Sequence, residues 1–239
     1  MENLLLAALP AAQQRALLEC SEHVELVTGE TLSEPNQRIQ NVFFPTTSLV
    51  SLIISTERHS QLEVGLIGNE GMLGVSLILG VHTSPLRAQV RGGGSAWRMD
   101  VTAFSRALGH NPTLARELGR YLYVLVSLIA QSAACGRFHP VEERLARLLL
   151  MTRDRTHSSQ FRITHETLAK MLGVRREGVT QAASALRRGN VIDYSRGNVE
   201  ILDVARLEAA ACTCYASAKD TYERVLEPNV QGRRCLVIS

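Results

Sequence analysis

The sequence predicts an α+β fold in three consecutive parts, and three observations support this prediction. Apolar residues alternate with a period of two between residues 22 and 101 and step with a helical period between residues 112 and 135. After these come two short helices joined at Gly173 and followed by a hairpin pattern. We therefore divide the chain into an antiparallel β-barrel or roll (1–110), a long helix (111–136) and a helical C-terminal domain (137–239).

Composition and charge favour a globular protein with a polyanionic partner. The 239 residues include 26 Lys and Arg, 23 Asp and Glu and 45% hydrophobic residues, so a disordered chain is excluded. Residues 1–110 hold seven basic and ten acidic side chains, whereas residues 137–200 hold twelve basic and seven acidic ones. A basic segment after an acidic one indicates a separate module that faces a polyanion.

Cysteine usage and hydropathy predict a cytoplasmic protein. The five cysteines are an odd number without repeated spacing, which is typical of reduced thiols: Cys20, Cys135, Cys212, Cys214 and Cys235. Glu2 stands where a signal peptide needs positive charge, and the longest apolar run, Tyr121 to Ala130, is shorter than the ~18 residues that span a bilayer. We expect no secretion, no membrane association and no disulfide scaffold.

The N-terminal part reads as one amphipathic helix followed by short strands. The helix covers residues 4–20, and the strands are separated by Gly, Pro, Asn and Ser clusters every 8–12 residues or so. The strand-like segments include Val42 to Phe44, Leu49 to Ile54, Leu62 to Leu66, Val75 to Gly80, Arg87 to Val90 and Ser95 to Val101. Gly92 to Gly94 is a turn, since it lacks the Lys and the following helix of a phosphate-binding loop.

The long helix begins at Asn111 and Pro112, and its apolar residues predict a dimer. One stripe steps by four and three residues and forms the expected dimer seam: Leu114, Leu118, Tyr121, Leu125 and Leu128. A second stripe, Leu122, Val126, Ile129 and Ala133, is expected to lie against the chain's own roll. A helix with two apolar faces needs two surfaces to bury, which favours a homodimer. The alternative is a single buried helix inside a monomer.

Residues 161–202 carry the strongest functional signal. Thr164 caps a helix over 165–172, Gly173 makes the turn, and a second helix buries Val179, Ala182, Ala183 and Leu186. Its exposed face is rich in Arg, Glu, Thr and Gln, and residues 191–201 alternate like a hairpin. This is a winged helix-turn-helix, in which Arg pairs with guanine, Gln with adenine and Glu with cytosine. A helical hairpin with a solvated charged face is the alternative.

The segment ITHETLAKMLGVRREGVTQAASALRRGNVIDYSRGNVEIL resembles the winged helix-turn-helix of the Crp/Fnr transcription regulators. The resemblance implies a cyclic-nucleotide-binding-like roll, a dimerisation helix and a DNA-binding domain, in that order. It places Arg176, Glu177 and Gln181 at the base-reading positions, although Gln181 stands where the best-known members carry Arg. Arg175 takes the place of a small capping Ser or Thr. We expect the DNA backbone to be contacted by Arg175, Thr180, Arg187, Arg188 and Arg196.

The resemblance also implies a homodimer that binds double-stranded DNA at a pseudo-palindromic operator. The two half-sites of this operator would lie about 34 Å apart. RNA polymerase and an unknown small-molecule effector are left open as partners. In the roll, Gly74-Val75 and Leu86-Arg87-Ala88 stand where cyclic-nucleotide binders carry Gly-Glu and Arg-Ser/Thr-Ala. The residues that bind the ribose and the phosphate of a cyclic nucleotide are therefore replaced, and cyclic AMP is not expected to bind in the usual way. Binding of a different anion is left open, because Arg87 stands one position away from the usual Arg.

Other chemistries find less support. Cys20 alone cannot hold an N-terminal iron–sulfur cluster, and Cys212-x-Cys214 needs partners such as His157 or His165 to bind zinc, so we expect no cofactor and no metal. No catalytic motif indicates an enzyme. A rival function is a roll-domain adaptor or sensor that contacts proteins instead of DNA. Residues 205–227 read as one further helix that packs on the DNA-binding domain.

Overall fold

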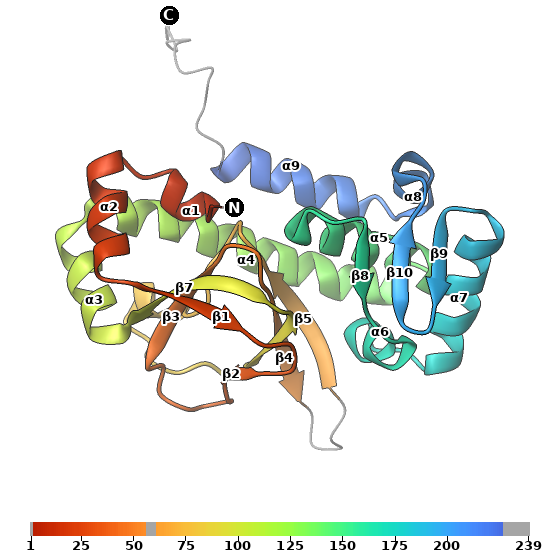
Figure 1. Ribbon diagram of the computed structural model, residues 1–239, viewed down its shortest axis with the longest axis horizontal. Helices are drawn as coiled ribbons and strands as arrows, with labels where there is room; N and C mark the ends of the chain where they lie inside the picture. The colour runs from red at the N-terminus through yellow and green to blue at the C-terminus, as the bar shows by residue number, and fades with distance from the viewer. Residues whose placement is uncertain (1, 56–60, 227–239) are drawn as a thin grey trace, which may run out of the picture.

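The computed structural model describes residues 2–55 and 61–226 (Figure 1). A β-rich N-terminal region lies beneath one long helix, and a mixed helical domain follows at the far end of that helix. The predicted α+β class and the order roll, long helix, helix-turn-helix are confirmed.

The first helix is broken into two. α1 (Leu4–Ala7) is capped by the Asn3 carboxamide, whose oxygen accepts from the amides of Leu5 and Leu6, and α2 (Ala11–Glu19) starts after Pro10. The prediction of one helix over residues 4–20 is wrong because Pro10 lacks an amide hydrogen and takes an extended conformation.

Two antiparallel sheets form the roll. One has the order β1-β7-β3 and the other β2-β6-β4-β5. The strands are β1 (Glu22–Leu26), β2 (Thr31–Ser33), β3 (Asn41–Pro45), β4 (Leu49–Ser55), β5 (Gln61–Ile67), β6 (Arg87–Gly92) and β7 (Gly94–Asp100).

Two segments of the roll are helical, and only the first of them was an expected strand. Residues Val75–Leu79 form the 3-10 helix η1, flanked by Gly74 and Gly80 in left-handed conformations. Residues Val101–His110 form α3, which is capped by Asp100, whose carboxylate accepts from the amides of Thr102 and Ala103. The helical period therefore returns before Asn111, earlier than the sequence suggested.

The long helix α4 (Pro112–Phe138) starts as predicted, with the Asn111 side chain accepting from the amide of Leu114. The expected dimer seam, however, is buried inside the chain. Leu114, Leu118 and Tyr121 pack with Phe44, Met72 and Phe104 of the roll, Leu125 packs with Leu52 and Ile67, and Leu128 packs against α9.

Exposure on α4 lies on another face. Tyr123 is 60% exposed and Val126 is 58% exposed, and Ala130, Ala133 and Arg137 continue the same 3-4 spacing along the helix. The assignment of Leu114, Leu118, Tyr121, Leu125 and Leu128 to a dimer seam is therefore wrong, and so is that of Val126 to the roll face. Both predicted stripes are apolar, and the roll and α9 cover the stripe that was expected to form the dimer seam.

The C-terminal domain consists of helices around a small sheet of order β8-β10-β9. Its elements are α5 (Val141–Thr156), β8 (Gln160–Arg162), α6 (His165–Leu172), α7 (Arg176–Arg188), β9 (Ile192–Ser195), β10 (Asn198–Ile201), α8 (Val204–Ala210) and α9 (Cys214–Leu226). Strand β8 was not expected from the sequence.

The expected single helix over residues 205–227 is interrupted. α8 ends at Ala210, Ala211 to Thr213 turn the chain, and α9 then runs back along α4 (Figure 1). Ala218 and Tyr222 of α9 pack with Val124 and Leu128, so this helix covers α4 rather than lying on the DNA-binding domain alone. Glu227 lies outside the described residues.

By length and composition alone, α4 is apolar enough to cross a membrane, with a mean hydropathy of 1.3 over its most apolar window. Its contacts give a different account of this composition. One face of α4 packs on the roll and another on α9, so apolar residues are required on two sides for packing within the chain.

Candidate nucleic-acid interface

The turn between α6 and α7 is made by Gly173. The Thr164 hydroxyl accepts from the Thr167 amide to start α6, and Gly173 ends it with φ +63°, a left-handed conformation that favours glycine. A Cβ at Gly173 would also lie 2.8 Å from the Leu62 side chain of β5. The turn therefore needs glycine for its backbone conformation, whereas the Leu62 contact involves the end of a part-exposed side chain that can move.

Helix α7 has one apolar and one polar face, as the sequence predicted. Val179, Ala182, Ala183 and Leu186 are buried in a core that they share with Leu145 and other residues of α5 and α6. Burial of this face fixes the rotation of α7 about its own axis. The opposite face therefore points to solvent in a defined orientation.

The expected base-reading residues lie on that solvent face. Arg176, Glu177 and Gln181 are all exposed, and Ser184 continues the stripe one turn further on. Sequence reasoning missed Ser184, although its spacing of three from Gln181 and seven from Glu177 was a usable signal. Together these side chains offer donors and acceptors of the kind that read base edges.

The expected backbone-contacting residues are also exposed but differ in their partners. Arg175 precedes α7 without capping it by a side-chain hydrogen bond. The Thr180 hydroxyl donates to the Arg176 carbonyl at 3.0 Å, and Arg187 pairs with Asp193 at 3.2 Å. Arg188 forms no ion pair within residues 2–55 and 61–226.

The wing is a tight hairpin between β9 and β10. Arg196 and Gly197 both have positive φ, +50° and +84°, which is the pattern of a two-residue hairpin turn and sets Arg196 at its tip. The Tyr194 hydroxyl donates to the Ile163 carbonyl at 2.7 Å and so ties the wing to the segment before α6.

His165 joins α6, α7 and the wing, a role that sequence reasoning missed. Its ring stacks on Tyr194 with centroids 4.3 Å apart, and its Nδ1 lies 3.0 Å from the Thr180 hydroxyl. Burial and the positive charge of Arg176 lower the pKa of His165. A neutral ring that donates from Nδ1 to Thr180 fits this geometry, because the Thr180 hydrogen goes to the Arg176 carbonyl.

Comparison with known proteins agrees with this geometry. A sequence model of the Crp-like helix-turn-helix domain matches residues 143–210, which span most of α5 and all of α6, α7, the wing and α8. No curated protein sequence matches the chain.

Solved structures extend the likeness to the roll and α4. FixK2 from Bradyrhizobium japonicum is 14% identical with a TM-score of 0.69, covering 80% of this chain and 98% of its own. A protein assigned to the Crp/Fnr family from Eubacterium rectale is 18% identical with a TM-score of 0.67, covering 87% and 99%. A CRP-family regulator from Thermus thermophilus is 18% identical with a TM-score of 0.67, covering 79% and 96%. The chain has the fold of the Crp/Fnr regulators.

The roll of this Crp/Fnr fold contains a small cavity of about 260 Å³ where the degenerate ligand positions were expected. Gly74, Val75 and Leu86 line it together with Leu125 and Ile129 of α4. Arg87 does not line it. Its guanidinium pairs with Glu34 at 2.9 Å, so an anion would have to displace that carboxylate to reach it.

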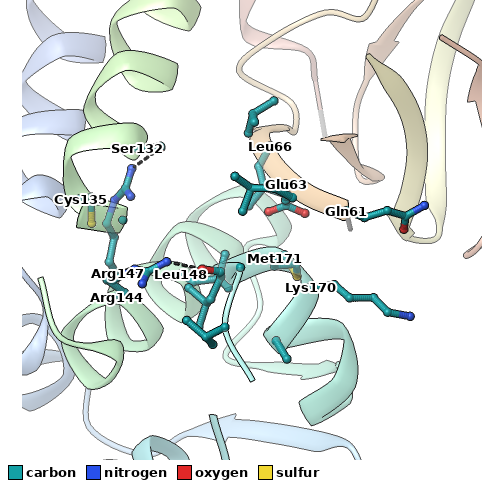
Figure 2. A pocket seen from close by; sticks show the side chains of 18 of the residues that line it. Gln61, Glu63, Leu66, Ser132, Cys135, Arg144, Arg147, Leu148, Lys170 and Met171 are labelled. Carbon is teal, nitrogen blue, oxygen red and sulfur yellow. Dashed lines mark hydrogen bonds between the residues drawn. The ribbon is translucent and has the colours of Figure 1, made fainter. Parts of the chain in front are cut away.

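A larger cleft of about 1240 Å³ separates β5 from the DNA-binding domain (Figure 2). Glu63 of β5 lines it, together with Arg144 and Arg147 of α5 and with Lys170 of α6 and Arg176 of α7. Burial raises the pKa of Glu63 from 4.5 to about 7, against the hydrogen bond from Ser51 and the charges of Arg91 and Arg155. The cleft is therefore lined by a carboxyl group with a raised pKa and by several basic side chains.

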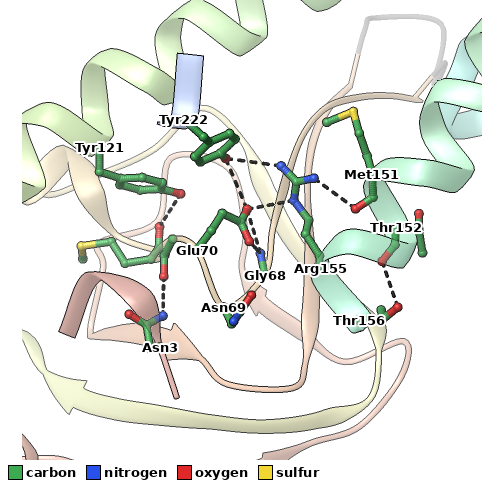
Figure 3. Close-up of polar contacts among 12 residues, drawn as sticks. Asn3, Gly68, Asn69, Glu70, Tyr121, Met151, Thr152, Arg155, Thr156 and Tyr222 are labelled. Carbon is green, nitrogen blue, oxygen red and sulfur yellow. Dashed lines mark hydrogen bonds and ion pairs between the residues drawn. The ribbon is translucent and has the colours of Figure 1, made fainter. Parts of the chain in front are cut away.

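A buried polar network joins the roll, α5 and α9 (Figure 3). Arg155 Nε donates to Glu70 Oε1 at 2.8 Å, and the Tyr222 hydroxyl accepts from Arg155 Nη2 and donates to Glu70, both at 3.3 Å. Arg155 is only 6% exposed and Glu70 also accepts from the Gly68 amide. This network fixes the end of α9 where it meets the roll and the DNA-binding domain.

One group of possible metal ligands lies outside the helix-turn-helix, at the end of α4. Cys135, His139, Cys212 and Cys214 come together, although no metal site was expected from the sequence. The histidines considered as partners there are elsewhere: His157 lies beside Asn69, and His165 lies against Tyr194. A hydrogen bond from Cys212 lowers the pKa of the Cys135 thiol to about 4, with further contributions from His139 and Arg147.

Proposed function

We propose that the protein is a homodimeric, sequence-specific DNA-binding transcription regulator that acts in the cytoplasm. The observation that supports this most strongly is the exposed face of α7, which holds Arg176, Glu177 and Gln181 above a buried apolar face. A helix of this kind, placed second in a helix-turn-helix, enters the major groove with its N-terminal residues at the base edges.

The phosphate contacts we assign to Arg175, Thr180, Arg187, Arg188 and Arg196 surround that face on the start and end of α7 and on the wing tip. Backbone contacts position the protein on the duplex, and base contacts select the sequence. The Crp/Fnr fold of the chain and the basic character of residues 137–200 both support this division.

The dimer in this proposal forms through the exposed face of α4. Tyr123, Val126, Ala130 and Ala133 follow a 3-4 spacing with small residues toward the end, which allows two helices to pack closely about a two-fold axis. Each protomer then presents one α7, and the operator is pseudo-palindromic with half-sites about 34 Å apart. We do not expect cyclic AMP to bind in the usual way, because Val75 and Leu86 offer no polar group.

The test is selection of bound sequences from random duplex DNA by the purified protein, followed by two variants. A palindromic motif is expected. Arg176→Ala should cost about 1–3 kcal/mol of specific binding and relax one base position, whereas Arg188→Ala should weaken all sequences alike.

Equal losses on specific and random DNA for both variants would overturn these residue assignments. An adaptor that contacts proteins through α7 predicts a different result, namely no salt-dependent DNA binding at all. Salt-sensitive binding without an enriched motif would instead indicate a DNA-binding protein whose two α7 helices are out of register until an effector binds.

A further inference from the structure

Four side chains from two distant parts of the sequence meet at the end of α4. Cys135 and His139 are one helical turn apart, at the last turn of α4 and its C-cap. Cys212 lies in the turn between α8 and α9, and Cys214 is the first residue of α9. The cluster therefore joins the connection between α4 and α5 to the connection between α8 and α9.

The ligand atoms are close enough for a single ion. Cys135 Sγ and Cys212 Sγ are 3.5 Å apart, Cys214 Sγ and His139 Nδ1 are 3.7 Å apart, and all four atoms lie within 4.8 Å of one another. In a tetrahedral site with Zn–S bonds of about 2.3 Å and Zn–N bonds of about 2.0 Å, ligand atoms are about 3.5–3.8 Å apart. The two short distances fall in this range before any adjustment of rotamers.

The surroundings fit a metal with thiolate ligands. Cys135, Cys212 and Cys214 are all buried, and His139 is half-buried. Arg147 is 8% exposed, and among the described residues its Nε has no hydrogen-bond partner, while its Nη2 donates to Ser132 at 3.2 Å. A divalent ion with three thiolates and a neutral imidazole carries one net negative charge, which the Arg147 guanidinium beside it can balance.

We propose that Cys135, His139, Cys212 and Cys214 bind one structural Zn²⁺. Three sulfur ligands and one nitrogen ligand complete the tetrahedral coordination that zinc takes in structural sites, with no position left for a substrate. A multi-iron cluster needs more room between its ligands than four atoms within 4.8 Å provide. The thiol protons released on binding pass to solvent.

The zinc ion would act as a clamp at the hinge of the molecule. His139 and Pro140 are the only residues between α4 and α5, so the direction of the DNA-binding domain relative to α4 is set there. A bond from this hinge to the α8–α9 turn restricts that direction. This places zinc at the connection between the roll with its long helix and the domain that carries α7.

The experiment uses the full chain purified under reducing conditions and measures bound zinc by mass spectrometry of the metal. We expect one zinc per chain in the wild type and in Cys20→Ser, because the Cys20 thiol is exposed and is not part of the cluster. Cys212→Ser and Cys214→Ser should lose the zinc. Wild-type protein stripped with a chelator and titrated with Co²⁺ should develop the visible absorption of tetrahedral cobalt, with three thiols per chain protected from alkylation.

The cobalt titration keeps the proposal testable if a serine variant does not fold. The proposal is overturned if the reduced wild type takes up neither zinc nor tetrahedral cobalt, or if zinc content is the same in Cys212→Ser as in Cys20→Ser. It is also overturned if Cys135 and Cys212 are found as a disulfide whose reduction restores no metal binding. None of these results depends on whether α7 binds DNA.

Discussion

Helices α4 and α7 use their faces differently, and the difference shows which apolar surface the chain itself leaves uncovered. In α7, a charged face opposes an apolar one, and the apolar face is satisfied within the domain. In the middle of α4, residues 121–130 are apolar except for Ser127, and the roll and α9 cover only two sides of the helix. The remaining side exposes Tyr123 and Val126, large side chains whose burial requires another molecule.

The largest effect is expected from a charge on the covered side of α4. Leu125 is buried among Leu52, Ile67 and Val50 of the roll. Leu125→Glu places an unpaired carboxyl group in this core and should lower the free energy of unfolding by roughly 4 kcal/mol or prevent folding. Urea denaturation followed by circular dichroism measures this. A normally folded variant that has lost only dimerisation would restore the seam that the sequence suggested.

The neighbouring residue should give the opposite result. Val126→Glu leaves the monomer core intact but repeats a charge across the two-fold axis, so we expect the dimer dissociation constant to rise about 100-fold, or about 2.7 kcal/mol. Sedimentation equilibrium measures it, with Leu79→Glu, another exposed apolar residue on the roll, as the control. If Val126→Glu and the control dimerise equally well, the exposed face of α4 is not the interface.

These two helices also show what could be read from the sequence. The faces of α7 were predicted correctly because Arg, Glu and Gln cannot be buried without partners, so the solvent side was identified by its residue types. The two stripes of α4 contain the same kinds of apolar residue. Periodicity finds such stripes but does not say which side of the helix the roll covers. The prediction therefore assigned a buried stripe to the dimer seam and the exposed Val126 to the roll, although Ile129 of the second stripe does pack against the roll.

Contacts between distant segments could not be predicted at all. Cys135 and Cys212 are separated by 77 positions, and they meet because Ala211 to Thr213 turn the chain and send α9 back along α4. A continuous helix over 205–227, which the apolar spacing favoured, would have carried Cys212 and Cys214 away from α4. The Arg155–Glu70–Tyr222 network depends on the same turn.

A smaller effect is expected in the cleft between β5 and the DNA-binding domain. The pKa of Glu63 is raised in the folded protein, to about 7 from 4.5. The folded state therefore holds the proton more tightly than the unfolded state, and the stability contributed by the protonated form is lost as pH rises through 7. Glu63→Gln has no carboxyl group to ionise at this position, so the variant does not lose this stability as the pH rises.

We expect the gain in stability from Glu63→Gln to be about 2 kcal/mol larger at pH 8 than at pH 5. Urea denaturation at the two pH values measures this gain, with the exposed Glu223→Gln as the control. A gain that does not change with pH would mean that Glu63 titrates alike in both states and that the roll and α6 do not enclose it. The packing of α7's domain on the roll would then be looser than that of α4.

The smallest effect concerns the charged face of α7. Arg187 pairs with Asp193 of β9, and both side chains are largely exposed, so Asp193→Asn should change the free energy of unfolding by less than about 0.5 kcal/mol. The variant releases Arg187 to phosphate and removes a negative charge near the DNA. Binding to random duplex should therefore tighten roughly threefold at low salt, with a steeper salt dependence. Asp220→Asn, which removes a similar exposed ion pair from α9, should leave DNA binding unchanged. Weaker binding by Asp193→Asn would show instead that the ion pair with Asp193 of β9 holds Arg187 in the orientation that DNA requires. The exposed face of α7, like the buried faces of α4, would then depend on contacts with a neighbouring element.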